Sequence, residues 1–309
     1  MVAWFGGVMM VESMCLPIPA PTIAGADLQP KKPVLRLPIG SCDTHAHLFG
    51  PADLYPYQQG RAYTPPDATP QQYRAMLRTM GFTRAVLIQP SVYGTDNRLM
   101  LDFLAQVDEN DDIAWRAVAV VDAHVTDAEL EQMHALGVRG IRINLVFPGG
   151  ITFDDVLSLA KRIASLGWHI QFLVDVSTFD QLADRLALLP VPAVIDHMGH
   201  MPTEKGLAHV GFQSLLQLVK EGRAWVKLTG PNRVTQLRHP PYSDVDPFFL
   251  ALLNANNERC LFGTDWPHVQ LPTPVPNDGD LVNEFLRLVP DPALQLKVLV
   301  HNPARLYGF

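Results

Sequence analysis

The sequence has few cysteines, few charged residues and no long apolar run. Its three cysteines, Cys15, Cys42 and Cys260, are odd in number and far apart, which excludes a disulfide framework and a cysteine-based zinc site. The apolar residues 1–11 lack a basic flank and reach Glu12 too early to span a membrane. This composition predicts a reducing, cytoplasmic location, and no membrane partner is expected.

Clusters of basic residues are also missing. The 24 Lys and Arg residues form no run and the formal net charge is −7, whereas binding to a phosphate backbone needs clustered positive charge. We therefore expect no nucleic-acid partner. A small anionic molecule is still compatible with the sequence, because a few buried arginines can invert the local field. Both a monomer and a homo-oligomer remain open.

What the chain does contain is enough apolar sequence for one large core. Apolar residues make up 48% of the 309 residues, and a single α/β barrel typically needs about 250 residues. The stretch 16–38 is rich in proline and predicts an extended lead-in. Because no linker divides the remainder, we predict an extended N-terminal segment over residues 1–40 and one domain over residues 41–309.

From residue 41 onward, short apolar runs alternate with amphipathic stretches. This pattern is typical of repeated strand–helix units around a parallel sheet. The predicted strands are Cys42–His47, Ala85–Gln89, Trp115–Val121, Gly140–Leu145, His169–Val174, Ala193–His197, Trp225–Leu228 and Arg259–Gly263. Eight such strands predict an α/β fold with a single (β/α)8, or TIM, barrel.

Several of the intervening helices have clear boundary signals. Thr69-Pro70 begins one, and the capping box from Thr126 to Glu129 begins another, which Gly137 ends. The further predicted helices are Phe153–Leu166 closed by Gly167, Thr178–Leu189, Asn277–Leu288 and Pro292–His301, with Asn302–Tyr307 packing the chain end onto the barrel.

Polar residues collect where the predicted strands end. They are His45 and His47, Gln89 and Ser91, Arg142 and Asn144, Asp196 and His197, Lys227 with Asn232 and Arg233, and Thr264, Asp265 and His268. The carboxyl ends of barrel strands share one rim, where catalytic groups lie. The sequence therefore predicts an active site at this rim.

Three histidines are candidates on separate grounds. His45 and His47 lie two residues apart in a strand, so they share a face and suit one metal ion or one substrate oxygen; two surface histidines are the alternative. His197 follows an apolar run and precedes a loop, which favours function over core packing. His200 and His268 are each close enough in sequence to a site residue to reach it.

Asp265 and Arg142 are the charged candidates. Asp265 follows an apolar strand and precedes Trp266, which would limit hydration and suit a general base; a helix cap or a salt bridge is the alternative. Arg142 in an apolar strand needs an anionic partner, either a substrate carboxylate or an internal acid. Arg233 is a weaker candidate because loop arginines are commonly solvated.

Seven motifs together resemble the amidohydrolase superfamily. They are Thr44–Pro51, Tyr63–Pro65, Gly94–Asn97, Gly137–Arg142, Ile195–Gly199, Gly263–His268 and Asn302-Pro303. Within amidohydrolase-related family 2, the chain is similar to the lactonase branch that includes 2-pyrone-4,6-dicarboxylate hydrolase and 4-sulfomuconolactone hydrolase. The resemblance covers essentially the whole chain from residue 41.

This resemblance implies a distorted (β/α)8 barrel that opens a cyclic ester by adding water. Asp265 matches the base that activates water. The resemblance implies that His45, His47 and His197 polarise the lactone carbonyl or position the nucleophile. Residues implied or predicted to contact substrate are Tyr63, Ser91, Arg142, His200, Arg233 and His268.

The sequence departs from the pyrone dicarboxylate hydrolases at three places. His200 replaces an arginine, Leu173 replaces a tyrosine, and the uncharged residues 147–150 replace basic ones. Neither an imidazole nor a leucine replaces a bidentate guanidinium. We therefore expect a related but different anionic lactone, such as a sulfonated or carboxymethyl muconolactone or a sugar-acid lactone.

The metal content is the second open point. Metal-dependent relatives usually add a histidine, lysine or glutamate from strands four and five, where this chain has Asn144, Gln171 and Asp175. His45, His47, His197 and Asp265 could still hold one Zn²⁺, although the pyrone dicarboxylate hydrolases work without metal. The prediction leans slightly towards one zinc, with no organic cofactor.

Three alternative functions remain open. The same barrel supports a lactone isomerase or a decarboxylase, and a degenerate barrel would bind an anionic metabolite without catalysis.

Overall fold

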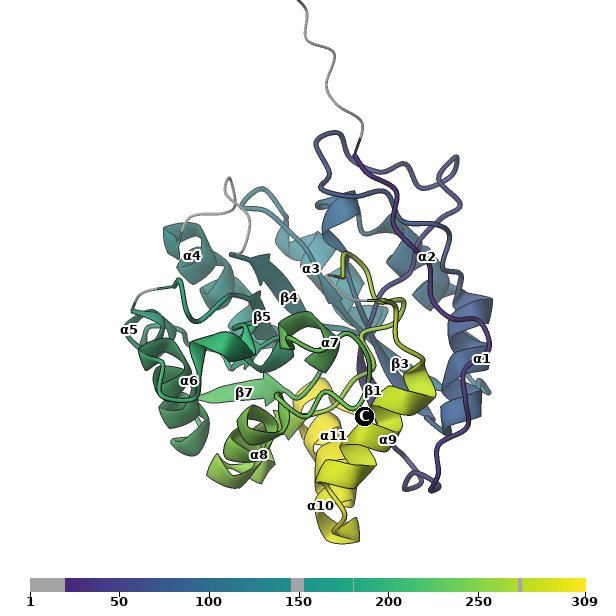
Figure 1. Cartoon of the computed structure of the whole chain (residues 1–309). Coiled ribbons are helices and arrows are strands. Elements are labelled where there is room, and N and C mark those ends of the chain that lie inside the picture. Colours follow the sequence, from purple (N-terminus) through teal and green to yellow (C-terminus); the bar gives the residue numbers. More distant parts are fainter. Residues whose placement is uncertain (1–19, 146–152, 180, 272–273) are drawn as a thin grey trace, which may run out of the picture.

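The computed structural model describes residues 20–145, 153–179, 181–271 and 274–309, and these form one barrel of eight parallel strands in sequence order (Figure 1). The strands are β1 (Cys42–Ala46), β2 (Arg84–Ile88), β3 (Ala114–Ala119), β4 (Val138–Asn144), β5 (His169–Leu173), β6 (Ala193–Ile195), β7 (Ala224–Lys227) and β8 (Cys260–Leu261). The predicted α/β fold and its TIM barrel are confirmed.

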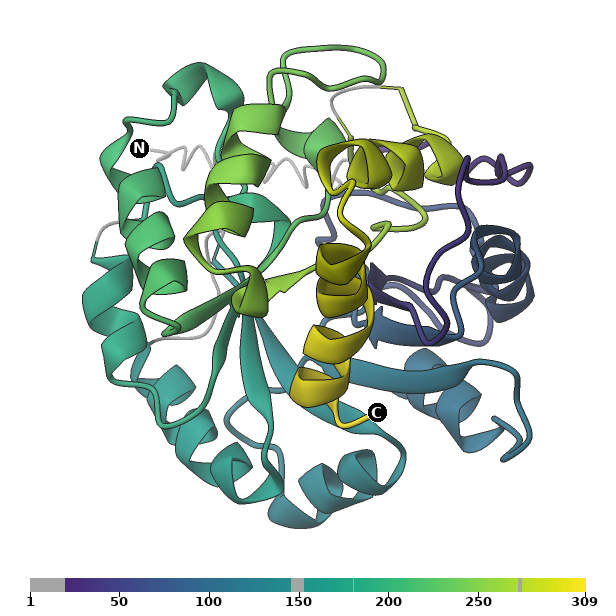
Figure 2. The ribbon, with the colours of Figure 1, turned by 90° about the horizontal axis from the view of Figure 1, so that it is seen from below.

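Helices cover the outside of the strands (Figures 1 and 2). They are α1 (Pro70–Met80), α2 (Arg98–Ala105), α3 (Asp127–Ala135), α4 (Phe153–Ile163), α5 (Leu182–Ala187), α6 (Val210–Lys220), α7 (Pro231–Val234), α8 (Asp246–Ala255), α9 (Asp278–Leu288), α10 (Pro292–Leu296) and α11 (Asn302–Tyr307). The predicted helix Thr178–Leu189 is wrong at its start, because Thr178 lies in a turn in which its N–H donates to the Asp175 carbonyl. Among the described residues of this range, only α5 is helical.

The predicted helix boundary signals work as expected. Thr69 and Gln72 form a reciprocal capping box at α1, and Thr126 and Glu129 form another at α3. Gly167 ends the α4 region in the left-handed conformation, with φ at 67°. Capping residues that are close together in sequence therefore determine where these helices begin and end.

Two apolar clusters make the core. The larger one lies between the strands and the outer helices. The smaller one contains Val86, Ile88, Val118 and Val194, and Tyr307 of α11 packs against it. The yellow C-terminal helices cross the strands in Figure 2, so the end of the chain covers one end of the barrel.

The barrel closes between β1 and β8 without a regular ladder. The Thr44 N–H donates to the Phe262 carbonyl at 3.1 Å, and the His47 N–H donates to the Trp266 carbonyl at 2.8 Å. The Asp265 N–H returns a bond to the His45 carbonyl at 2.8 Å. The predicted strand Arg259–Gly263 is shorter as β8, because the following residues cross over to β1 and so bring Asp265 beside His45.

The described part of the N-terminal segment, residues 20–40, lies extended along the barrel. Thr22 forms a single bridge with Thr64. The Lys31 N–H donates to the Asn277 side chain at 2.9 Å, and the Val34 N–H donates to the Asn283 side chain at 2.8 Å. The domain boundary at residue 40 stays a prediction. Among the described residues, no helix is long and apolar enough to cross a membrane.

Candidate active site

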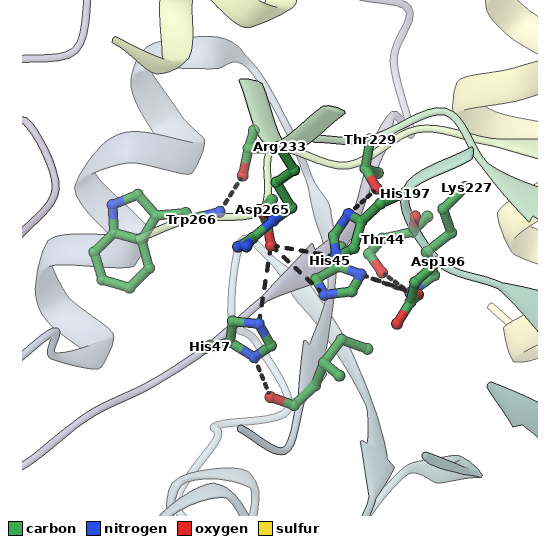
Figure 3. Close-up of polar contacts among 12 residues, drawn as sticks. Thr44, His45, His47, Asp196, His197, Lys227, Thr229, Arg233, Asp265 and Trp266 are labelled. Atoms are coloured by element: carbon green, nitrogen blue, oxygen red, sulfur yellow. Dashed lines mark hydrogen bonds and ion pairs between the residues drawn. The ribbon is translucent and has the colours of Figure 1, made fainter. Parts of the chain in front are cut away.

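Three histidines point at one carboxylate oxygen (Figure 3). His45 and His47 come from β1 and its end, His197 follows β6, and Asp265 follows β8. The Nε2 atoms of His45, His47 and His197 lie 3.7, 3.9 and 3.9 Å from Asp265 Oδ1. The structure thus brings together the four predicted catalytic residues, all of them buried.

The opposite ring nitrogen of each histidine contacts another group. His47 Nδ1 donates to the Ile88 carbonyl at 2.7 Å, so its neutral ring presents a lone pair at Nε2. His197 Nδ1 lies 2.8 Å from Thr229 Oγ1, and His45 Nδ1 lies 3.4 Å from Asp196 Oδ1. These contacts fix the direction in which each Nε2 atom points.

Burial keeps the three imidazoles neutral. It lowers the pKa of His47 to about 3, with the nearby Arg142 charge adding to the effect. Burial also lowers the pKa of His45 and His197 well below the ordinary value, and Lys227 contributes at His45. Neutral rings can accept or donate a hydrogen bond or bind a cation.

Asp265 has one satisfied and one unsatisfied oxygen. Arg233 Nε donates to Oδ2 at 2.5 Å, while Oδ1 is buried and has no hydrogen-bond partner among the described residues. Its backbone φ of 68° lies in the left-handed region, which is uncommon outside glycine. A held carboxylate with a free lone pair facing three imidazoles suits a general base.

Gly230 explains how Arg233 reaches this site. Gly230 has φ at 64°, and a Cβ atom there would lie 2.8 Å from His197 Nδ1. Glycine therefore lets the chain pass close to His197 before α7 begins. Arg233 lies one turn into that short helix.

A second charged layer lies behind His45. Lys227 Nζ donates to the Thr44 carbonyl at 2.7 Å and lies 3.3 Å from His45 Nδ1 and 3.9 Å from Asp196 Oδ1. Gln171 donates to Asp196 Oδ2 at 3.1 Å. Burial would raise the pKa of Asp196, but the combined effect of Lys227, Arg142, His197 and the Gln171 hydrogen bond lowers that pKa, so Asp196 stays ionised behind the imidazoles.

A hollow of about 310 Å³ opens beside these groups. Its lining residues are His47, Tyr63, Ser91, Arg142, Asn144, Leu173, His197, His200, Arg233, Val269 and Gln270. Five of the predicted substrate contacts therefore face one space. His268 does not line it, because its Nε2 lies 2.9 Å from Asp278 Oδ1 and its side chain faces a separate hollow. Substrate contact by His268 stays a prediction.

The donor atoms fit a metal ion in one of two groupings. His45, His47 and Asp265 each offer an atom within 4.8 Å of the others, and so do His45, Asp196 and His197. The distances of 3.7 and 3.9 Å to Asp265 Oδ1 suit ligands that each lie about 2.0–2.2 Å from a shared zinc ion. In the second grouping Lys227 Nζ lies 3.3 Å from His45 Nδ1 and 3.9 Å from Asp196 Oδ1, so a metal ion there would meet an ammonium group. In the first grouping Arg233 contacts only the other oxygen of Asp265, Oδ2, so the first is the better cation site.

The predicted four-residue zinc set stays a prediction, because the Nε2 atoms of His45, His47 and His197 all lie within 3.9 Å of Asp265 Oδ1. His197 falls in a different grouping from His47 and Asp265. The residues at 147–150, whose lack of charge was noted above, lie outside the described residues.

Sequence reasoning missed three side chains that orient the site. Thr229 follows the apolar run of β7 and contacts His197, so its position at a strand end was an available signal. Tyr73 lies on α1 and bonds to Asp43 at 3.0 Å, while Asp278 bonds to His268. Tyr73 lies 30 residues from Asp43 and Asp278 lies 10 residues from His268, and no local sequence pattern marks either pair.

The model of the amidohydrolase family Amidohydro_2 matches residues 42–309. The chain is 37% identical to a 2-pyrone-4,6-dicarboxylate hydrolase of Comamonas testosteroni, over 90% of this chain and 93% of the relative. It is 36% identical to a 4-sulfomuconolactone hydrolase of Rhizobium radiobacter, over 88% and 91%.

A solved structure and a more distant relative complete the comparison. The crystal structure of a probable 2-pyrone-4,6-dicarboxylic acid hydrolase from Acinetobacter baumannii, with citric acid bound, has a TM-score of 0.77 and 28% identity, over 88% of this chain and 100% of that one. A D-galactarolactone isomerase of Agrobacterium fabrum is 29% identical over 87% and 91%.

Proposed function

Because the chain belongs to the amidohydrolase family, we propose that it is a lactone hydrolase that opens the ring of a small anionic metabolite by adding water. The observation that carries the proposal is the convergence of three buried, neutral imidazoles on Asp265 Oδ1, an oxygen without a partner among the described residues. The lactone hydrolases among the relatives support the same reaction.

Asp265 is the proposed base. Its Oδ1 faces the space between the imidazoles, so it can take a proton from a water molecule there as the water oxygen bonds to the lactone carbonyl carbon. Arg233 holds Oδ2 and keeps the carboxylate oriented. The proton then passes to the leaving ring oxygen when the carbon–oxygen bond breaks, giving a hydroxy acid.

The histidines are proposed to act on the carbonyl oxygen and the water. His45, His47 and His197 present Nε2 atoms to the same space, and burial makes each contact stronger than it would be in water. Tyr63, Ser91 and Arg142 lie on the wall of the hollow and are proposed to hold the substrate carboxylate.

A zinc ion is proposed at His45, His47 and Asp265, where it would supply Lewis-acid polarisation of the carbonyl in place of direct contacts from His45 and His47. Metal-stripped protein should take up about one equivalent of Zn²⁺ in calorimetry, and the melting temperature should rise with it. The substitution His47→Gln should abolish both effects. Unchanged calorimetry and melting temperature on zinc addition would contradict the zinc site.

The base is tested with Asp265→Asn, which keeps the shape and an oxygen that accepts from Arg233. Turnover of every accepted lactone should fall by about 10²–10⁴-fold, the range for loss of a general base. Circular dichroism should show an unchanged fold. Unaltered turnover in the variant would refute this function.

The second candidate is a lactone isomerase, which the Agrobacterium fabrum relative favours. It uses the same barrel but yields a ring of changed size or double-bond position rather than an open acid. Product identity separates the two.

A further inference from the structure

The hollow beside Asp265 has one arginine that shares its acidic partner with a second cation. Arg142 and Arg233 are the two arginines that line it. Arg233 donates to Asp265 at 2.5 Å, so that pair is neutral. Arg142 reaches Asp196 Oδ2 at 3.4 Å and the Gln89 carbonyl at 3.4 Å, distances at the long limit of hydrogen bonding.

Arg142 is also buried with an unsatisfied donor. Its exposed fraction is 7%, and its Nε has no hydrogen-bond partner within the described part of the chain. Asp196 already faces Lys227 and Gln171 on other sides. A buried guanidinium in this state gains most from an anion that reaches it from the hollow.

Apart from Arg233, which is paired with Asp265, the described residues that line the rest of this hollow include no further cation. Leu173 and Val269 form apolar wall, and Asn144 and Gln270 are neutral. His200 is neutral as well, because burial lowers its pKa to about 4, with Arg233 adding to the effect. Its Nδ1 has no partner among the described residues, so it faces the substrate as a neutral hydrogen-bonding group.

A neighbouring hollow of about 540 Å³ shares Ser91, Arg142 and Asn144 with the first. The charged side chains that it adds are acidic, Asp122 and Asp155. Outside the Arg233–Asp265 pair, a second anion would therefore meet neutral or negative groups among the described residues of both hollows.

Resting on the proposed lactone hydrolysis, we propose that the substrate carries a single carboxylate, which binds Arg142, and that its remaining substituents are uncharged. Such substituents face His200 and Leu173 on one side and the neighbouring hollow on the other. The chemical class is a monoanionic lactone rather than a dicarboxylate.

The test uses two lactams with the same ring, which imitate the lactones but resist hydrolysis. One carries a single carboxylate and the other carries two. Calorimetry should show the monoacid binding at least about tenfold more tightly, because the second carboxylate loses its hydration without a charged partner. Equal or tighter binding of the diacid, or no binding of either lactam, overturns the proposal.

Two variants sharpen the result. His200→Arg adds a fixed cation to the neutral wall and should raise diacid affinity relative to monoacid affinity by about tenfold. His200→Gln alters the same side chain without adding charge and should keep the original preference. If His200→Arg leaves the ratio of diacid to monoacid affinity unchanged, His200 does not face the bound substrate as proposed.

Turnover of the matching lactones keeps this inference separate from the proposed function. If the monoacid lactam binds preferentially but neither lactone is hydrolysed, the hydrolase function fails while the charge preference stands. If both lactones are hydrolysed and the diacid lactam binds as tightly as the monoacid lactam, the proposed charge preference is wrong but the hydrolase function stands.

Discussion

The β1–β8 junction and the cluster of His45, His47, His197 and Asp265 lie next to each other, and each contains a fully buried aspartate. Asp43, at the junction, accepts from the Thr264 N–H at 2.9 Å, from Thr264 Oγ1 at 2.6 Å, from Tyr73 Oη at 3.0 Å and from the His45 N–H at 3.2 Å. Asp265 accepts one bond, from Arg233, and its other oxygen has no partner among the described residues.

The difference separates a structural carboxylate from a reactive one. Both oxygens of Asp43 are occupied by groups from β1, α1 and the segment after β8, so it joins three parts of the barrel. Asp265 keeps an oxygen that only a substrate, a water or a cation can satisfy. We therefore expect changes at Asp43 to alter stability and changes at Asp265 to alter turnover.

The largest stability effect is expected from Asp43→Ala. The substitution leaves the Tyr73 hydroxyl and two Thr264 donors buried without an acceptor, which should lower the free energy of unfolding by about 3–5 kcal/mol. Asp265→Asn should change it by less than about 1 kcal/mol. Urea denaturation measures the unfolding free energy of both variants. A similar decrease in the two variants would contradict the structural role assigned to Asp43.

A lower pH should have opposite effects on stability through the buried histidines and through Asp43 at the β1–β8 junction. Burial lowers the pKa of His47 and His169 to about 3 and that of His200 to about 4, so these groups stabilise the fold above pH 6.5 and that stability is lost as pH falls below it. Burial raises the pKa of Asp43 to about 6, so protonation between pH 6 and 3.8 favours the folded state.

The net effect of a lower pH should be a loss of stability, because the buried histidines outnumber the single aspartate Asp43. Each should contribute a loss of about 1 kcal/mol in unfolding free energy per pH unit below 6.5. Denaturation at pH 7.5 and 5.5 measures the slope. His169 is buried at the start of β5, away from the hollow, so His169→Gln should flatten the slope without touching the site; an equally steep slope would count against this account.

The smallest effect is expected from Tyr73→Phe. It removes one of the four donors to Asp43 but keeps the ring that stacks on Trp266 at 5.0 Å, so the cost should be about 0.5–1.5 kcal/mol. Tyr55→Phe is the matched control, because its hydroxyl bonds to Asp102 at an exposed position. If Tyr55→Phe lowers the free energy of unfolding as much as Tyr73→Phe does, burial of the hydrogen bond does not determine the size of the loss.

The barrel and its rim follow from local sequence patterns. Apolar runs predict the strands, and the capping residues Thr69 and Thr126 predict helix starts that the structure confirms. The order of the strands then places His45, His197 and Asp265 at one rim. These features depend on residues close together in sequence.

Other features depend on contacts that no local pattern contains. The short β8 results from bonds between residues after it and β1. The prediction of His268 as a substrate contact has no support from the hollow, because the buried Asp278 lies beside its ring. His47 and His197 fall in different groups of possible metal ligands because of their positions in the folded barrel. Sequence spacing does not contain this information.

The most direct test of lactone hydrolysis is one turnover in water enriched with ¹⁸O, followed by NMR and mass spectrometry of the product. Lactone hydrolysis should give a ring-opened hydroxy acid with one ¹⁸O atom in the new carboxylate. An unlabelled isomeric lactone, or released CO₂ with no open acid, would contradict it.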